Sequence, residues 1–207
     1  MLDRRVLDAA RPALLWAAQR LAAAGVSADA VTWCGFALGL SGAAAIAFGH
    51  PQVGLALILA SRLADGLDGT LARLGTPTDR GAFLDIALDF LFYASIPLAF
   101  ALAEPAANAL PAAVLLAAFI GTSSSFLAFA AVAERRGLKS TAYPAKGLYY
   151  LGGLTEGTET LLCFALMCLA PQHFAWWAYG FAVLCALTIV TRVAAGWRAF
   201  GARHPSV

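Results

Sequence analysis

One stretch of the chain decides the fold class and points to a site. Residues 61–89 read SRLADGLDGTLARLGTPTDRGAFLDIALD, which places aspartates at positions 65, 68, 85 and 89. Apolar sequence flanks this stretch on both sides, and the mean hydropathy of the chain is +0.75. A carboxylate at membrane depth costs about 2.5–3.5 kcal/mol on insertion scales, so four of them need protons, cations or a water-filled cavity as partners.

The spacing of the aspartates favours cations. Asp65 and Asp68 are three residues apart, which is about 60° around a helix, and Asp85 and Asp89 are four apart, which is about 40°. Each pair therefore presents two carboxylates on one helical face. Two such faces opposite each other would offer only oxygen ligands, which suit Mg²⁺ or Mn²⁺.

Composition alone predicts a membrane protein. Of the 207 residues, 61% are hydrophobic and 13% are charged, whereas soluble domains have about 25% charged residues. The formal net charge of +2 is too small to indicate a nucleic-acid partner. We therefore expect an all-α integral membrane protein that lies in the lipid bilayer.

The first residues are predicted to form an interfacial amphipathic helix. Pro12 and Arg20 interrupt the apolar run that a cleaved signal peptide would need. A helix that starts near Pro12 and ends at Gly25 fits better, because proline suits a first helical turn. Ser27 can then cap the first membrane helix. The expected organisation is an interfacial segment at 1–27 and a membrane domain at 28–207.

Six apolar stretches follow, and each is long enough to cross a membrane core of about 30 Å at about 1.5 Å per residue. They lie at residues 28–48, 52–74, 82–103, 109–134, 147–170 and 174–198. Six transmembrane helices would place both termini on the same side of the membrane.

Lysine and arginine are distributed unequally between the two sides. The turns near residues 48–53, 103–108 and 169–173 contain neither, and Arg62 and Arg192 lie within spans. The remaining cations lie near the termini or near the turns after the second and fourth spans. By the positive-inside rule the cation-rich side is cytoplasmic. We therefore expect a multi-pass protein of a bacterial inner membrane, with both termini and the aspartate site facing the cytoplasm.

The aspartates belong to a longer pattern, D-x-x-D-G-x-x-A-R followed by G-x-x-x-D-x-x-x-D, which resembles the signature of the CDP-alcohol phosphotransferase (CDP-alcohol phosphatidyltransferase) family. Seven residues separate the arginine of this pattern from its second glycine, one fewer than is usual in the family. The six expected spans and the interfacial helix also resemble the family, so the resemblance covers essentially the whole chain. The eight fixed positions are Asp65, Asp68, Gly69, Ala72, Arg73, Gly81, Asp85 and Asp89.

The resemblance implies a phospholipid-synthesis enzyme that transfers a phosphatidyl, or other substituted phosphate, group from CDP-diacylglycerol to an alcohol and releases CMP. Two divalent ions, Mg²⁺ or Mn²⁺, can bridge a pyrophosphate and absorb charge on the departing CMP. A homodimer is implied by the resemblance alone.

The family also implies roles for individual residues. Asp89 is implied to be the catalytic base or to share the second ion. Gly69, Ala72, Arg73 and Gly81 resemble nucleotide-site positions. The metal ligands implied by the resemblance are Asp65, Asp68, Asp85 and Asp89.

Two further groups are candidates for an acceptor pocket. Lys139, Lys146 and Arg192 form a basic group that would hold an acceptor phosphate or a lipid phosphate, as basic residues of this region do in the family. Attraction to anionic lipids, at about 1 kcal/mol per cation, explains them equally well. Glu156 and Glu159 are three residues apart in the expected helix at 147–170 and share one face. They either line a pocket for a polyol or amine-bearing alcohol, or they hydrogen-bond within the bundle.

Two other functions are open from the sequence. One is a cation-coupled membrane transporter, since intramembrane acids also serve ion transport. The other is a catalytically inactive family member that acts as a partner protein. Metal-dependent release of CMP separates an enzyme from both. The sequence leaves the alcohol acceptor unassigned, and a soluble CDP-alcohol with a lipid acceptor would use the same site.

Overall fold

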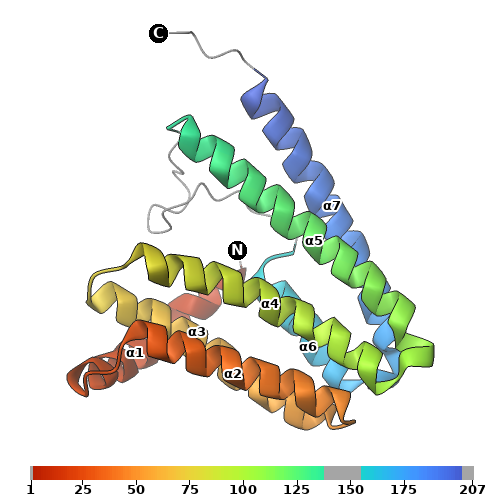
Figure 1. The fold of residues 1–207 in the computed structure, drawn as a ribbon, viewed down its shortest axis with the longest axis horizontal. Coiled ribbons are helices and arrows are strands. Elements are labelled where there is room, and N and C mark those ends of the chain that lie inside the picture. The colour runs from red at the N-terminus through yellow and green to blue at the C-terminus, as the bar shows by residue number, and fades with distance from the viewer. Residues whose placement is uncertain (1, 138–154, 202–207) are drawn as a thin grey trace.

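The structure is a computed structural model that describes residues 2–137 and 155–201. Within these residues the chain is helical and contains no strand (Figure 1). The elements are α1 Leu2–Ala23, α2 Ala28–Ala47, α3 Pro51–Leu74, α4 Asp79–Ala103, α5 Pro105–Arg135, α6 Gly157–Leu169, the 3-10 turn η1 Pro171–His173 and α7 Phe174–Phe200.

Side chains cap the starts of α2 and α4, two of the helices that form the site. The Ala30 N–H donates to the Ser27 hydroxyl at 3.2 Å, which confirms Ser27 as the cap of α2. Thr78 caps α4 in the same way, because its hydroxyl accepts from the Gly81 N–H at 3.1 Å. The α3–α4 turn is thus fixed at the end of α3 that carries the aspartates.

The start predicted for α1 is wrong. The helix begins at Leu2 and contains Pro12 in its interior, where the missing proline N–H removes one backbone hydrogen bond. The residues before Pro12 are rich in leucine, arginine and alanine, all good helix formers, and they continue the helix past the proline. Gly25 ends the segment as predicted, since its φ of 75° is the left-handed conformation that favours glycine.

Small residues bring α2 close to α3 and α4. A Cβ on Gly35 would lie 3.0 Å from the Ala64 Cβ of α3. A Cβ on Gly39 would lie 2.5 Å from the Phe92 ring of α4, a separation that atoms do not tolerate. Small residues at such crossings let helices approach closely in membranes, where the hydrophobic effect does not drive helices together. The motif helices α3 and α4 are therefore held against one face of α2.

The helices form two groups that share one core. Figure 1 shows α2, α3 and α4 lying together, with α5 and α7 paired along the opposite side and α6 between them. Buried aromatic rings from three helices fill the space between the groups. Phe100 of α4 stacks on Phe174 of α7 with ring centroids 4.7 Å apart, and Phe92 meets Phe164 of α6 edge-on at 6.3 Å.

The chain is a multi-pass membrane protein, although the predicted six spans are matched only in part. Four helical segments are long and apolar enough to cross a membrane, namely Ala28–Ala47, Asp79–Ala103, Pro105–Arg135 and Pro171–Phe200. Helix α3 has the length but carries the charges of the motif, and α6 is a shorter apolar helix. The start of the predicted span 147–170 lies outside the described residues. Large apolar side chains such as Leu110, Val183 and Trp176 lie exposed on the outer faces, as a lipid environment permits.

Candidate active site

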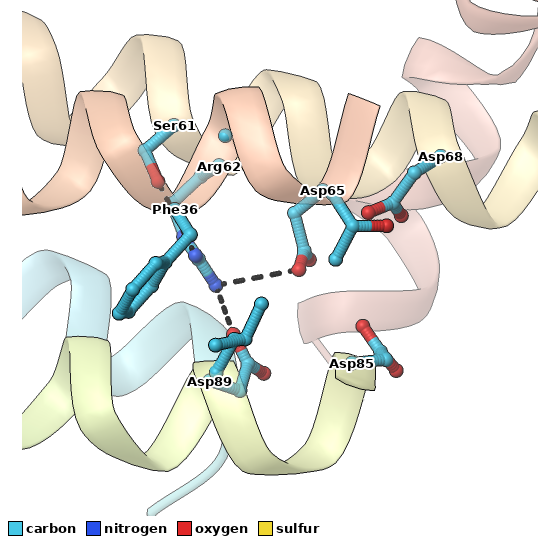
Figure 2. Close-up of a pocket in the computed structure, with 10 residues that line it drawn as sticks. Phe36, Ser61, Arg62, Asp65, Asp68, Asp85 and Asp89 are labelled. Carbon is cyan, nitrogen blue, oxygen red and sulfur yellow. Dashed lines mark hydrogen bonds and ion pairs between the residues drawn. The ribbon is translucent and has the colours of Figure 1, made fainter. Parts of the chain in front are cut away.

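The four motif aspartates converge on one small pocket, as their spacing predicted. Asp65 and Asp68 project from α3, and Asp85 and Asp89 face them from α4 (Figure 2). Helix α2 closes the pocket with Thr32, Gly35 and Phe36. The pocket extends along α3 from Ser61 and Arg62, at the middle of this helix, to Asp68, nearer the α3–α4 turn.

Three of the aspartates form a group suited to a divalent ion. Carboxylate oxygens of Asp65, Asp68 and Asp85 lie within 4.8 Å of one another. Asp68 is buried, and its Oδ2 has no hydrogen-bond partner, whereas Asp85 is exposed at the mouth of the pocket. A buried carboxylate oxygen without a partner is costly, and a hard cation would satisfy it. The residues present therefore fit a Mg²⁺ or Mn²⁺ ion.

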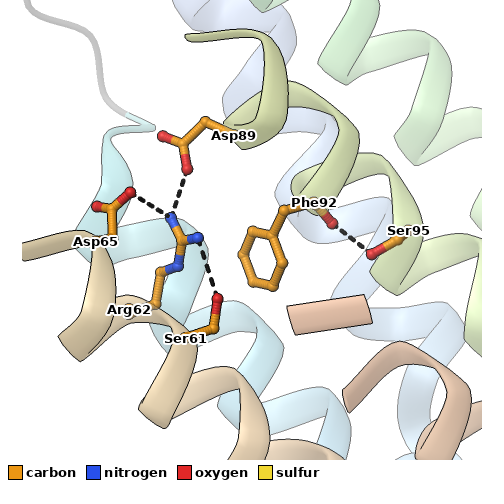
Figure 3. A network of polar contacts seen from close by, with 6 residues as sticks. All are labelled: Ser61, Arg62, Asp65, Asp89, Phe92 and Ser95. Atoms are coloured by element: carbon orange, nitrogen blue, oxygen red, sulfur yellow. Dashed lines mark hydrogen bonds and ion pairs between the residues drawn. The ribbon is translucent and has the colours of Figure 1, made fainter. Parts of the chain in front are cut away.

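Asp89 lies in a different environment from the other three. Arg62 Nη1 donates to Asp89 Oδ1 at 2.6 Å and lies 3.6 Å from Asp65 Oδ1 (Figure 3). The Arg62 guanidinium also lies 4.1 Å from the centroid of the Phe92 ring, a cation–π contact. Asp89 is thus paired with a protein cation, and Asp65 faces both that cation and the three-carboxylate group.

The sequence analysis did not predict Arg62 as a site residue and counted it only as a cation within a predicted span. Two features of the sequence could have indicated its role in the site. Arg62 lies three residues before Asp65 and therefore shares its helical face. An arginine inside an apolar helix also requires a partner, because its guanidinium stays charged.

The expected nucleotide residues surround the end of α3. The Arg73 side chain lies over Gly69, since a Cβ on Gly69 would be 3.4 Å from Arg73 Nη1, and Arg73 Nη2 donates to the Thr70 hydroxyl at 3.1 Å. Ala72 is partly buried on the same helix, and Gly81 lies across the turn in the first part of α4. These positions do not line the pocket itself, and their binding roles stay predictions.

An ion pair connects α4 to α2 next to Gly81. Arg80 Nη2 lies 2.5 Å from Asp29 Oδ2 and joins the start of α4 to the first turn of α2. A Cβ on Gly81 would lie 3.4 Å from Asp29 Oδ1, so Gly81 is packed closely against this pair. The first turn of α4 therefore contacts the first turn of α2 through an ion pair in which Arg80 is largely exposed.

The basic acceptor group is not assembled within the described residues. Arg192 is buried in α7, and its Nη1 donates to the Thr122 carbonyl oxygen at 2.8 Å and contacts the Ser125 hydroxyl at 3.4 Å. These contacts join α7 to α5. Lys139 and Lys146 lie outside the described residues, so a phosphate site that includes them stays a prediction.

The two glutamates lie at a helix start, which corrects the expectation that they lie within one helix. Helix α6 begins at Gly157, so Glu156 precedes it and Glu159 lies in its first turn. The two residues form a capping box, in which the Glu156 N–H donates to Glu159 Oε2 at 3.2 Å. The N–H groups of a first turn lack helical partners, and this arrangement satisfies part of them. An acceptor role for the pair stays a prediction.

The fold and the site together define a multi-pass membrane protein with an acidic, oxygen-rich pocket between α3 and α4 that α2 covers. The chain belongs to the CDP-alcohol phosphatidyltransferase family, whose model matches residues 25–190. Family membership confirms the resemblance found in the sequence and makes the chain a phosphatidyltransferase of phospholipid synthesis by class.

The chain is also similar to a bacterial membrane protein in sequence and to a solved synthase in fold. The chain is 50% identical over 197 residues to the inner membrane protein YnjF of Escherichia coli K12, and the match covers 95% of this chain and 96% of that protein. It is also similar in fold to phosphatidylinositol phosphate synthase (PgsA1) of Mycobacterium tuberculosis. The structure of that synthase with CDP-DAG bound matches with a TM-score of 0.73 at 22% identity, covering 89% of this chain and 93% of that chain. Its complex with manganese and citrate matches with a TM-score of 0.72 at 23% identity, covering 89% and 88%.

Proposed function

We propose that the protein transfers a phosphatidyl group from CDP-diacylglycerol to an alcohol and releases CMP, using divalent ions held by the motif aspartates. The observation that carries this proposal is the three-carboxylate group of Asp65, Asp68 and Asp85 in a chain of this family. The solved synthase with CDP-DAG and its manganese complex support the choice of donor and metal.

We assign metal binding and nucleotide binding to different residues of the motif. Asp65, Asp68 and Asp85 would hold the first ion, and Asp89 with Asp65 would share a second. Bound metal supplies positive charge that stabilises the pyrophosphate and the departing CMP. Arg73 adds a cation at the nucleotide side, and the small residues Gly69 and Ala72 would let the cytidine approach the helix closely once the Arg73 side chain moves off Gly69.

The proposed transfer is a single in-line displacement. The alcohol oxygen bonds to the lipid-side phosphorus while the bond from that phosphorus to the bridging oxygen breaks, and CMP leaves with the electron pair. Asp89, which the family resemblance implies to be the base or a ligand of the second ion, would accept the proton of the alcohol hydroxyl. Its ion pair with Arg62 holds this carboxylate in the pocket and facing α3.

The orientation in the membrane is proposed from charge. Arg73, Arg80, Arg136 and Arg198 lie at the helix ends that alternate along the chain with the cation-free turns. The positive-inside rule favours the cytoplasmic side for these ends, for both termini and for the site. A six-span bacterial inner-membrane protein is the arrangement we propose. The proposal of a homodimer rests on the family resemblance, and cross-linking in intact membranes would test it.

The acceptor is proposed only by chemical class. Glu156 and Glu159 favour a polyol or an amine-bearing alcohol, and Lys139, Lys146 and Arg192 favour a phosphorylated one. Michaelis constants of variants, measured with different acceptors, distinguish these two acceptor classes. Glu159→Gln should raise the acceptor KM while leaving the donor KM unchanged, since it removes acceptor binding and not chemistry. Lys146→Ala should impair only phosphate-bearing acceptors, and equal loss with neutral acceptors would contradict phosphate recognition.

An acceptor screen tests the function itself. Purified protein is incubated with CDP-diacylglycerol, Mn²⁺ or Mg²⁺ and one alcohol at a time, including glycerol phosphate, serine and inositol phosphate. CMP and the lipid product are measured together. Equimolar CMP and a new phospholipid with one acceptor is the expected result. A set of acceptors that all fail with CDP-diacylglycerol, followed by success with a soluble CDP-alcohol and a lipid acceptor, would reverse the assignment of donor and acceptor.

A further inference from the structure

We propose that Arg62 is an internal cation that competes with the second divalent ion for the Asp65–Asp89 side of the pocket. The protein then has one strong ion site and one weak site. This inference rests on the proposed function, because it concerns the ions that the transfer requires. It assigns a role to a residue outside the eight fixed positions of the motif.

Asp65 divides the pocket into two halves. Its carboxylate is one of the three whose oxygens lie within 4.8 Å of one another, together with Asp68 and Asp85. The Asp65 Oδ1 atom also lies 3.6 Å from Arg62 Nη1, which in turn lies 2.6 Å from Asp89 Oδ1. Figure 2 shows Asp65 between these two sets of side chains. One half of the pocket is a group of acids, and the other half already contains a positive charge.

Contacts other than the ion pairs also hold Arg62 in this place. Its side chain is only 15% exposed. The guanidinium lies over the Phe92 ring at 4.1 Å and near the Tyr93 ring at 5.7 Å, and its Nη2 donates to the Ser61 hydroxyl at 3.3 Å. Phe92 is itself fully buried against Gly39. Arg62 is therefore packed into the protein rather than resting loosely on the carboxylates (Figure 3).

A second ion would need the carboxylates that Arg62 contacts. In two-metal sites the ions lie about 3.5–4 Å apart and share carboxylate ligands. Asp65 and Asp89 are the pair that such a shared ion would bridge. A guanidinium stays protonated at every pH a protein tolerates, so it repels an ion at this place under all working conditions. Arg62 Nη1 lies 2.6 Å from Asp89 Oδ1 but 3.6 Å from Asp65 Oδ1, so its charge acts most strongly on the half of the pocket that contains Asp89.

Manganese binding to the purified full-length protein tests this inference without any turnover. Binding isotherms, with free Mn²⁺ followed by electron paramagnetic resonance, are measured for the wild type, Arg62→Gln, Arg62→Lys and Arg136→Gln. Arg136 is the matched control, because it also packs on an aromatic ring, Phe200 at 5.4 Å, but lies at the junction of α5 and α7.

The wild type should show one strong Mn²⁺ site and a second at least about tenfold weaker, which corresponds to about 1.4 kcal/mol. Arg62→Gln should tighten the second site by about tenfold or more and bring spin coupling between two neighbouring ions. Arg62→Lys, which keeps the charge, should retain the difference between the sites. Arg136→Gln should match the wild type.

Two equal strong sites in the wild type would overturn the inference and leave the proposed function intact. A second site that Arg62→Gln fails to tighten would overturn it as well. The wild-type isotherm tests the unequal sites by itself, so the inference can fail even if Arg62→Gln does not fold. Wild-type protein without any strong Mn²⁺ site would instead overturn the metal part of the proposed function, and this inference with it.

Discussion

Arg62 of α3 donates a 2.6 Å hydrogen bond to Asp89 of α4, a residue 27 positions later in the chain. This pair joins the two halves of the motif directly. Asp65, Asp68 and Asp85 lie close together as like charges, whereas Asp89 lies outside this group and makes the shorter of the two Arg62 ion pairs, at 2.6 Å against 3.6 Å for Asp65. The four aspartates therefore differ in what they do for stability, although all four belong to one pocket.

Neutralising Asp89 and neutralising Asp68 should change stability in opposite directions. Asp89→Asn leaves the Arg62 charge without its main partner, which should cost about 1–2 kcal/mol after allowance for the 30% exposure of Asp89. At about 2–4 °C per kcal/mol, Tm falls by several degrees. Asp68→Asn removes a buried carboxylate from a group of like charges, so Tm should hold or rise.

The measurement is thermal unfolding of both variants in detergent with a chelator present, so that bound metal does not mask the effect. A lower Tm for Asp68→Asn than for Asp89→Asn would contradict the difference in environment. It would mean that the hydrogen bonds that Asp68 accepts outweigh its burial and the repulsion from the neighbouring carboxylates in the absence of metal.

Gly39 should be intolerant of even a methyl group. A Cβ at this position would lie 2.5 Å from the Phe92 ring, which supports the Arg62 guanidinium. Gly39→Ala should therefore lower the free energy of unfolding by about 1–3 kcal/mol, as overpacking does, and so lower Tm. It should alter Mn²⁺ affinity as well. Gly180→Ala is the control, because nothing lies within 4 Å of a Cβ there and alanine favours a helix. Equal Tm values for the two variants would show that Gly39 is not a close contact.

Cation asymmetry predicts which turns face the cytoplasm. In a background without the four native cysteines, single cysteines at positions 78 and 140 should react only with reagents that reach the cytoplasm. Cysteines at positions 50 and 172 should react from outside. Labelling of positions 50 and 140 from the same face would contradict six spans with both termini inside.

Local sequence signals predicted those parts of the fold that local chemistry determines. The Ser27 cap, the end at Gly25 and the four long apolar helices follow from propensity, capping and hydropathy over short windows. The convergence of the aspartates follows from helical spacing and from a turn too short to separate α3 from α4. These signals need no knowledge of which helices pack together.

The features that the sequence did not predict depend on opposing local preferences or on contacts between helices. The start of α1 was wrong because proline at a first turn is a preference, which the strong helix formers before Pro12 overcome. The capping box at Glu156 was missed because the apolar residues on both sides of the polar stretch 155–160 favoured one continuous helix. The Arg62–Asp89 pair crosses between helices, and spacing within a helix contains no information about its partner.

The most direct test of the account is Mn²⁺-dependent release of CMP from CDP-diacylglycerol, comparing wild-type protein with Asp68→Asn in the presence of the acceptor found by the screen. Even partners of metal ligands change metal affinity or activity by about 10–100-fold, so loss of a ligand should reduce CMP release by more than about 100-fold. A neutral amide is easier to insert than a carboxylate, so the variant should still reach the membrane in normal amounts. CMP release by Asp68→Asn at the wild-type rate, or wild-type release that persists in excess chelator, would contradict the central claim that the motif aspartates bind the metal needed for phosphatidyl transfer.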